Sequence, residues 1–216
     1  NRRSQAIARL ASVEEAASPW AAVAASVEEA AVPDNANNPR TNLVMIGMPG
    51  AGKSTLGVVL AKILGLGFED TDLTIQNQCG KTLPVLIDEY GPEGFIQIEN
   101  DVLKTIDVSQ SVISTGGSAV YSTGAMEHLR SIGLIVYLRV DLDELEERLG
   151  GLQERGVVMK DGMGMELSAI YDERIPLYEQ YAEIILDVDG KTVRESAMEL
   201  TEKLRELQRA YVLGAR

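Results

Sequence analysis

The stretch GMPGAGKST, from Gly47 to Thr55, constrains the fold of this chain more than any other feature. It follows the apolar run at 42–46 and precedes the helical pattern TLGVVLAKIL. Two glycines bracket four residues, so backbone N–H groups can converge on a phosphate, and the helix that follows adds a favourable dipole. The pattern therefore predicts a strand, a phosphate-binding loop (a P-loop) and a helix, in that order.

The same residues predict a nucleotide site with magnesium. Lys53 supplies positive charge to the β- and γ-phosphates, and the Ser54 hydroxyl is placed to ligate Mg²⁺. The predicted nucleotide-binding residues of the loop are Gly47, Gly50, Gly52, Lys53, Ser54 and Thr55. The loop alone does not separate a kinase from a GTPase or a motor protein.

From Asn42 onward, apolar runs alternate with helical patterns, which is typical of a parallel α/β sheet. Strands are predicted at 43–46, 68–71, 111–117, 133–140 and 183–188, with helices between them and a final helix at 193–209. The expected fold class is a three-layer α/β/α P-loop fold with a five-stranded parallel sheet, preceded by a helical or flexible N-terminal extension.

The composition of the chain limits the kinds of partner that it can bind and the compartments in which it can work. The net charge of −13 argues against a broad nucleic-acid surface, which needs clustered Lys and Arg. No run approaches the roughly 18 apolar residues of a membrane span. Cys79 is the only cysteine, which favours a reducing compartment. The chain starts at Asn1 with the arginine-rich NRRSQAIARL, similar to the end of a targeting sequence, so the predicted location is the cytoplasm or an organelle matrix such as the plastid stroma.

Residues 1–41 are predicted to be an extension and linker. The heptapeptide ASVEEAA occurs at 11–17 and again at 25–31, an offset that returns to almost the same helix face. Turn-forming residues follow at 33–40. Two interpretations stay open: a flexible arm with nascent helix, or a docking helix that binds a protein partner through Trp20.

Two carboxylates follow the second predicted strand, in FEDTD at 68–72. In a continuous strand Asp70 and Asp72 would face the same way, toward the edge of the sheet where open α/β folds bind ligands. The alternative interpretation is an acidic turn that caps the next helix.

With these motifs in order, residues 42–189 resemble the shikimate kinase family. The matching motifs are the loop, DTD, Phe95–Glu99 (Phe-x-x-x-Glu), TGGS at 115–118, Arg148 before a lid, Arg155 in the lid, and RIPLY at 174–178. The resemblance implies an ATP- and Mg²⁺-dependent kinase of amino-acid biosynthesis that phosphorylates a hydroxyl of a small carboxylate-bearing metabolite. It also implies a kinase domain over 42–216, with a lid around 150–165.

The resemblance implies catalytic roles for three residues. Lys53 holds the phosphates, Asp72 binds the acceptor hydroxyl and takes its proton, and Arg155 arrives with the lid to neutralise the transferring phosphate. Ser54 and Asp70 are the implied magnesium residues, Asp70 acting through water.

The remaining matches imply binding roles. Arg148 is expected to lie against the adenine. Arg174 is expected to bind the carboxylate of the acceptor, and backbone N–H groups of Gly116 and Gly117 to reach the acceptor. Glu99 is the last expected acceptor-binding residue.

Two departures from the family pattern bear on the acceptor. Ile96 stands where the family has an arginine that helps clamp the shikimate carboxylate, and Ser118 replaces a third glycine. Ile96 is expected to present an apolar wall. Losing the positive charge favours an acceptor with an ammonium group, which Glu99 would take while Arg174 takes the carboxylate. Homoserine or another hydroxy-amino acid is therefore favoured over shikimate, which resembles a shikimate-kinase-like homoserine kinase branch.

Three alternatives stay open on the sequence. The chain is shikimate kinase proper, or a kinase fold that serves as a structural or interaction subunit through residues 1–41, or a nucleotide monophosphate kinase. The DTD and RIPLY motifs disfavour the last, because they indicate a small carboxylate-bearing acceptor.

Overall fold

The computed structural model describes residues 40–149 and 167–212. Within them the elements run β1 (Asn42–Ile46), α3 (Lys53–Leu64), β2 (Gly67–Asp70), α4 (Thr71–Cys79), α5 (Leu83–Leu103), β3 (Ser111–Ser114), the 3-10 helix η1 (Ala119–Tyr121), α6 (Thr123–Ile132), β4 (Gly133–Arg139), α7 (Leu142–Leu149), α8 (Leu167–Tyr181), β5 (Ile184–Asp187) and α9 (Val193–Val212). The predicted alternation of strands and helices is confirmed.

Over the described ranges the strands form one parallel sheet of five, in the order β2-β3-β1-β4-β5. Val44 of β1 pairs with Ile113 of β3 on one side and with Ile135 of β4 on the other. Every residue of β1 is buried. A central parallel strand has helices over both faces, which is why its sequence is a continuous apolar run rather than an alternating one.

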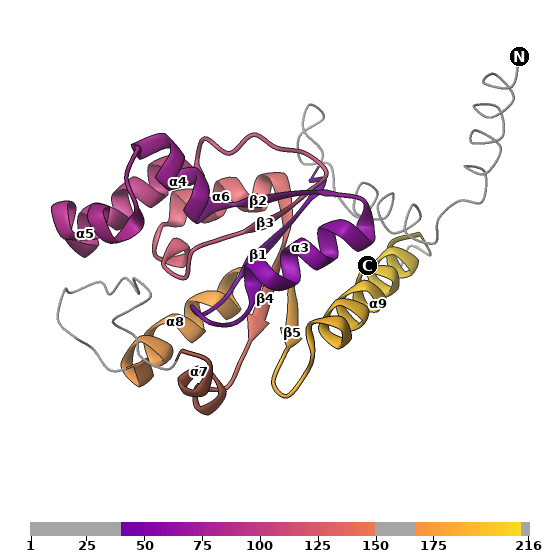
Figure 1. Ribbon diagram of the computed structural model, residues 1–216. Helices are drawn as coiled ribbons and strands as arrows, with labels where there is room; N and C mark the ends of the chain where they lie inside the picture. The colour runs from indigo at the N-terminus through magenta and orange to yellow at the C-terminus, as the bar shows by residue number, and fades with distance from the viewer. Residues whose placement is uncertain (1–39, 150–166, 213–216) are drawn as a thin grey trace, which may run out of the picture.

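Helices cover both faces of the sheet (Figure 1). Helices α3 and α9 pack together on one face, and α6 and α8 lie against the other. A second, smaller apolar cluster joins α4 and α5 through Ile75, Leu86, Phe95 and Val102. This cluster stands at the carboxyl edge of β2, so it forms a separate wall beside the phosphate-binding loop.

The strand boundaries differ from the prediction by one residue at several ends and by three residues at the end of β3. Strand β2 ends at Asp70, and β3 ends at Ser114, before the glycines. The two helices expected on either side of Gly91 are confirmed: α5 consists of two helices joined at a kink, where the backbone leaves helical geometry at Gly91 (φ 69°, ψ 173°) just before Pro92. Proline restricts the residue before it to extended conformations or turns, so the helical path breaks at that point.

Several predictions lie outside the described residues. They concern residues 1–39 of the predicted extension and the whole segment expected to be the lid, around 150–165, including Arg155. Between 40 and 149 and between 167 and 212, no helix has both the length and the apolar character required to cross a membrane.

Candidate active site

The loop between β1 and α3 has the backbone that phosphate binding requires. Gly47, Gly50 and Gly52 have φ of +143°, +83° and +91°, which side chains rarely allow. A Cβ on Gly47 would lie 2.7 Å from the carbonyl oxygen of Leu138. The loop sits at the carboxyl end of β1, where the strand order reverses and open α/β folds bind ligands. The predicted strand, loop and helix are confirmed.

Lys53 is held inside this loop. Its side chain is buried, and Nζ donates to the carbonyl oxygens of Gly47 (2.8 Å) and Met48 (3.0 Å). Burial lowers the pKa of Lys53 to about 8, although the nearby Asp72 carboxylate acts in the opposite direction. Phosphate oxygens at the loop favour the charged form, so nucleotide binding and protonation of Lys53 are coupled.

Ser54 and Asp70 form an oxygen-donor pair beside the loop. The Ser54 hydroxyl donates to Oδ2 of Asp70 (2.8 Å) and lies 3.0 Å from the Ser114 hydroxyl. Hydroxyl and carboxylate oxygens suit Mg²⁺, which is usually bound through one or two protein ligands together with phosphates and water. No group of three or more His, Cys, Asp or Glu suited to a metal occurs in the described part of the chain.

Asp70 and Asp72 do not alternate along a strand, so that prediction is wrong. Asp72 belongs to the first turn of α4, and its N–H donates to Oδ1 of Asp70 (3.0 Å), which caps the helix. The alternative interpretation, an acidic turn that caps the next helix, is therefore confirmed. In a helix successive side chains are rotated by about 100° rather than 180°, so Asp70 and Asp72 do not face the same way as they would in a strand. Burial raises the pKa of Asp72, and the Asp70 carboxylate raises it further.

A cavity of about 370 Å³ connects the loop to the expected acceptor residues. Its lining residues are Pro49, Gly50, Gly52, Lys53, Ser54, Thr55, Asp72, Leu83, Phe95, Glu99, Thr115, Gly116, Gly117, Ser118, Leu149 and Arg174. All five residues expected to bind the acceptor line this one space. Asp70, which is bonded to Ser54, and Arg148 are not part of its wall.

Glu99 is a fully buried carboxyl group in the cavity wall. Its Oε2 accepts from the Ser118 hydroxyl (2.6 Å), and its Oε1 has no hydrogen-bond partner among the described residues. Burial raises the pKa of Glu99 to about 7, against the opposing effects of Ser118 and Arg174. A buried acceptor atom without a donor is costly, so Oε1 is a natural contact for a donor on a ligand.

The glycine turn at 115–118 lies close to the carboxylates. A Cβ on Gly116 would lie 2.4 Å from Oε1 of Glu99 and 3.0 Å from Oδ1 of Asp72, so this position requires a glycine. The Gly116 N–H donates to the Thr71 hydroxyl (3.2 Å) rather than into the cavity, which differs from the expected contact with the acceptor. Thr71 was not among the predicted site residues. Its position between Asp70 and Asp72 was the only feature of the sequence that could have indicated a role for it in the site.

Arg174 also lines the cavity and is 1 % exposed. Its Nε donates to the Tyr121 hydroxyl (3.0 Å). Burial by itself would lower the pKa of Arg174, but the Tyr178 and Tyr121 side chains outweigh it and the pKa is raised. The guanidinium therefore stays charged. Tyr121 was missed by sequence reasoning, because the TGGS motif ends three residues before it.

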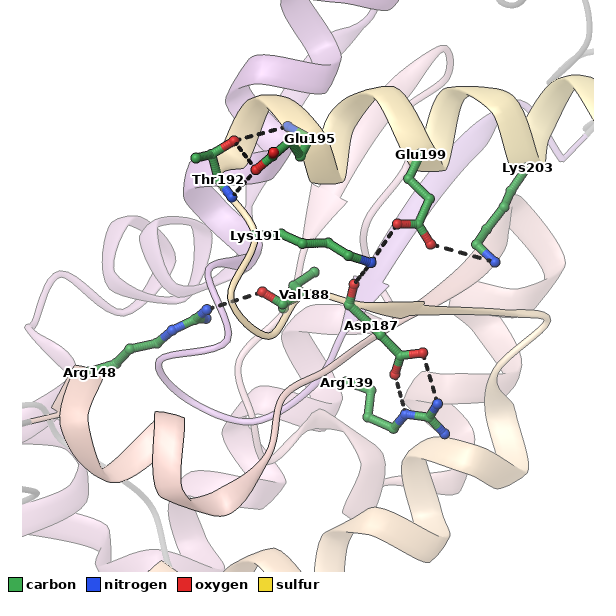
Figure 2. A network of polar contacts seen from close by, with 9 residues as sticks. All are labelled: Arg139, Arg148, Asp187, Val188, Lys191, Thr192, Glu195, Glu199 and Lys203. Carbon is green, nitrogen blue, oxygen red and sulfur yellow. Dashed lines mark hydrogen bonds and ion pairs between the residues drawn. The ribbon is translucent and has the colours of Figure 1, made fainter.

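Arg148, in the last turn of α7, contacts the phosphate loop. Its Nη1 contacts the carbonyl oxygens of Gly50 and Ala51, both at 3.4 Å. Its Nη2 donates to Glu144 of α7 and to the Val188 carbonyl oxygen, the latter at 3.4 Å (Figure 2). Arg148 thus joins the phosphate loop to the turn between β5 and α9. Its expected contact with adenine stays a prediction.

Polar contacts hold the turn between β5 and α9 (Figure 2). Arg139 and Asp187 form an ion pair across β4 and β5. Lys191 donates to the Asp187 carbonyl oxygen (2.7 Å) and to Glu199 of α9. The turn that faces Arg148 is therefore fixed on the sheet side and on the helix side.

Comparisons with known proteins agree on one family. The family model described as shikimate kinase matches residues 49–205. Shikimate kinase of Pseudomonas paraeruginosa is 36 % identical over 167 residues, covering 77 % of this chain and 97 % of that protein. Shikimate kinase of Thiobacillus denitrificans is 36 % identical over 166 residues, covering 76 % and 88 %. The chain belongs to the shikimate kinase family.

Solved shikimate kinases share the fold. The Acinetobacter baumannii shikimate kinase, in complex with shikimate, matches with a TM-score of 0.69 and 27 % identity over 76 % of this chain and 93 % of that one. The Bacteroides thetaiotaomicron shikimate kinase matches with a TM-score of 0.66 and 31 % identity over 76 % and 98 %. Members of the family use ATP with Mg²⁺, as P-loop kinases do, and transfer phosphate to an alcohol.

Within this family member, Ile96 does not have the position that the sequence suggested. It packs against the cluster of Ile75, Leu86, Phe95 and Val102 and is not part of the cavity wall. The apolar part of the wall comes from Leu83, Phe95 and Leu149. Ser118, in contrast, does line the cavity. The prediction that Ile96 forms an apolar wall is therefore wrong.

Proposed function

We propose that this chain transfers the γ-phosphoryl group of ATP to a hydroxyl of a small carboxylate-bearing metabolite, and that it prefers a hydroxy-amino acid such as homoserine to shikimate. One observation carries the proposal: the phosphate loop, Asp72, Glu99 and Arg174 line a single cavity of about 370 Å³. A cavity of this size fits a small acceptor beside the phosphates of a nucleotide.

In the proposed step, the acceptor oxygen forms a bond to the γ-phosphorus while the bond from phosphorus to the β–γ bridging oxygen breaks. ADP leaves, the hydroxyl proton passes to Asp72, and the product is a phosphate monoester. The raised pKa of Asp72 suits a group that takes a proton in the course of transfer. Lys53 stabilises the charge that develops on the phosphates.

Ser54 and Asp70 would hold Mg²⁺ together with phosphate oxygens. When bound, the ion neutralises phosphate charge and orients the β- and γ-phosphates. The Asp72 backbone N–H fixes the Asp70 carboxylate, and the Ser54 hydroxyl bonds to the same carboxylate, so both groups are already oriented.

Two buried charged residues of the cavity wall, Arg174 and Glu99, support the preference for an amino acid. Arg174 offers a buried positive charge, which matches a carboxylate. Glu99 offers a buried carboxyl group with an unused oxygen, and Asp72 lies near it on the same side of Gly116. An acceptor with a carboxylate and an ammonium group would pair with both Arg174 and Glu99, whereas shikimate has no cation for Glu99.

A direct test compares acceptors that differ in one group. ADP release would be followed with L-homoserine, 4-hydroxybutyrate and shikimate, since 4-hydroxybutyrate is homoserine without its ammonium. A charge-assisted hydrogen bond is worth about 2 kcal/mol, so kcat/KM should be about 30-fold higher for homoserine than for 4-hydroxybutyrate. The variant Glu99→Gln should remove most of that difference. Higher kcat/KM for shikimate than for homoserine would establish shikimate kinase proper instead.

The acceptor preference should depend on pH through Glu99. At saturating ATP and Mg²⁺, kcat/KM for homoserine is expected to rise as pH increases through about 7, because only the ionised carboxylate binds an ammonium strongly. Saturating ATP keeps Lys53 charged, which prevents a fall near its nucleotide-free pKa of about 8. The profile of Glu99→Gln should lack the rise.

Thermal unfolding provides a second measurement of the raised pKa of Glu99. Its pKa in the folded chain lies above the ordinary value of 4.5, so ionisation favours the unfolded chain. The Glu99 contribution to the free energy of unfolding should therefore decline as pH rises from about 4.5 to about 7. Glu99→Gln should gain stability relative to the parent protein across this window, and a constant difference would contradict the assignment.

A further inference from the structure

Tyr121 has a fixed place beside the glycine turn. It ends η1, and its N–H donates to the Ser118 carbonyl oxygen (3.0 Å), while the next residue, Ser122, donates to the Ala119 carbonyl oxygen (3.1 Å). These bonds set the direction in which the Tyr121 ring leaves the backbone. Helix α8, which carries Arg174, packs against η1.

Tyr121 and Arg174 make two contacts with each other. The Arg174 Nε donates to the Tyr121 hydroxyl at 3.0 Å, and the guanidinium carbon lies 5.0 Å from the centre of the Tyr121 ring. The second distance is within the range of cation–π attraction. Since Arg174 is only 1 % exposed, each of its donors needs a protein or ligand acceptor, and Tyr121 provides one.

The other side of Arg174 faces the glycine turn. A Cβ on Gly117 would lie 3.0 Å from Nη1 of Arg174, so the terminal nitrogen rests against this glycine in the cavity wall. One turn along α8, the Tyr178 hydroxyl donates to the Gly117 carbonyl oxygen (2.7 Å). The guanidinium is thus enclosed between the Tyr121 ring and a turn that α8 itself fixes.

We propose that Tyr121 is a positioning residue for acceptor recognition. By engaging Nε, it fixes the orientation of the Arg174 guanidinium in the cavity wall, where the guanidinium receives the carboxylate of the acceptor. The inference rests on the proposed function to the extent that the acceptor carries a carboxylate. A fixed guanidinium loses less conformational freedom when the acceptor binds, so the effect appears in acceptor affinity.

The test compares two Tyr→Phe variants. Tyr121→Phe keeps the ring and removes the acceptor for Nε, and it should raise the KM of the acceptor about 10-fold, with kcat and the KM of ATP changed less than about 2-fold. Tyr137→Phe is the matched control, because Tyr137 is buried and stacks on Tyr178 while its hydroxyl has no hydrogen-bond partner within the described ranges. Its acceptor KM should not change. An unchanged KM in Tyr121→Phe would overturn the proposal.

A double variant tests whether Tyr121 acts through Arg174. Lysine has no Nε, so adding Tyr121→Phe to Arg174→Lys should raise the acceptor KM no further, whereas a general structural role would add its full effect. The acceptors used are L-homoserine and shikimate.

A spectroscopic readout does not depend on turnover. In ¹H–¹⁵N spectra of the full chain, the Arg174 Nε–H signal, assigned by its loss in Arg174→Lys, should exchange slowly with water in the parent protein and at least 10-fold faster in Tyr121→Phe. Equal exchange rates would refute the positioning role. If the parent protein phosphorylates neither acceptor, the proposed acceptors are wrong, and this signal still decides the role of Tyr121.

Discussion

Replacement of Lys53 by methionine is expected to lower kcat for phosphoryl transfer on the order of 10³-fold. The Lys53 ammonium is buried in the phosphate loop and donates to the Gly47 and Met48 carbonyl oxygens. A charge held in place in a water-poor site stabilises the transition state without reorganisation, and methionine has a similar shape but no charge. Steady-state kinetics at saturating acceptor would measure the loss.

The same substitution should make the nucleotide-free protein more stable. Burial lowers the pKa of Lys53 to about 8, so at neutral pH the charged form costs free energy in the folded chain. Lys53→Met should therefore raise the thermal midpoint at pH 7 while it removes activity. Lys62→Met, at an exposed position in the last turn of the same helix, is the matched control and should change neither quantity. A loss of activity below 10-fold in Lys53→Met would argue against a catalytic role for Lys53.

Replacement of Asp72 by asparagine is expected to have the second large effect, a fall in kcat of about 10³-fold, with little change in the KM of ATP. Asparagine keeps the size of the side chain and can still contact the hydroxyl, but it cannot accept its proton. Asp72 lines the cavity beside Lys53, whereas the ATP phosphates are expected to contact the loop itself. Kinetics with the preferred acceptor would separate kcat from both KM values.

Asp72→Asn should also stabilise the fold at neutral pH. Burial and the neighbouring Asp70 raise the pKa of Asp72, so its ionised form favours the unfolded chain above the ordinary pKa of 3.8. Thermal unfolding at pH 7 would show a higher midpoint. Asp88→Asn, at an exposed position on α5, is the control and should leave activity and stability unchanged. Lower stability together with normal kcat would indicate that Asp72 is a structural residue.

Much of the donor side of the site could be predicted from local sequence. The loop from Gly47 to Thr55 requires its own backbone geometry, because each glycine has a positive φ that other residues rarely adopt. The alternation of apolar runs and helical patterns predicted the parallel sheet, since strands buried on both faces need continuous apolar sequences. These features depend on neighbours in the chain, which the sequence displays directly.

The acceptor side required the tertiary structure. Glu99 of α5, Ser118 after β3 and Arg174 of α8 are far apart in the chain. Only packing shows that Ser118 donates to Glu99 and that Oε1 of Glu99 has no hydrogen-bond partner among the described residues. Ile96 shows the opposite case: the sequence placed it in the wall, but packing puts it against the cluster of α4 and α5. Helix rotation decides such positions, and it depends on what the opposite face buries.

Asp72 and Tyr121 separate the two kinds of information most clearly. The sequence identified Asp72 by its motif but gave it strand geometry, and the structure places it in a helix that Asp70 caps. Tyr121 has no motif, and its contact with Arg174 spans 53 positions in the chain. The sequence by itself determined the phosphate loop, the sheet and the family motifs, because these are local patterns. The tertiary structure alone decided how the side chains of the acceptor cavity are buried and which groups they contact, because these side chains come from distant segments of the chain.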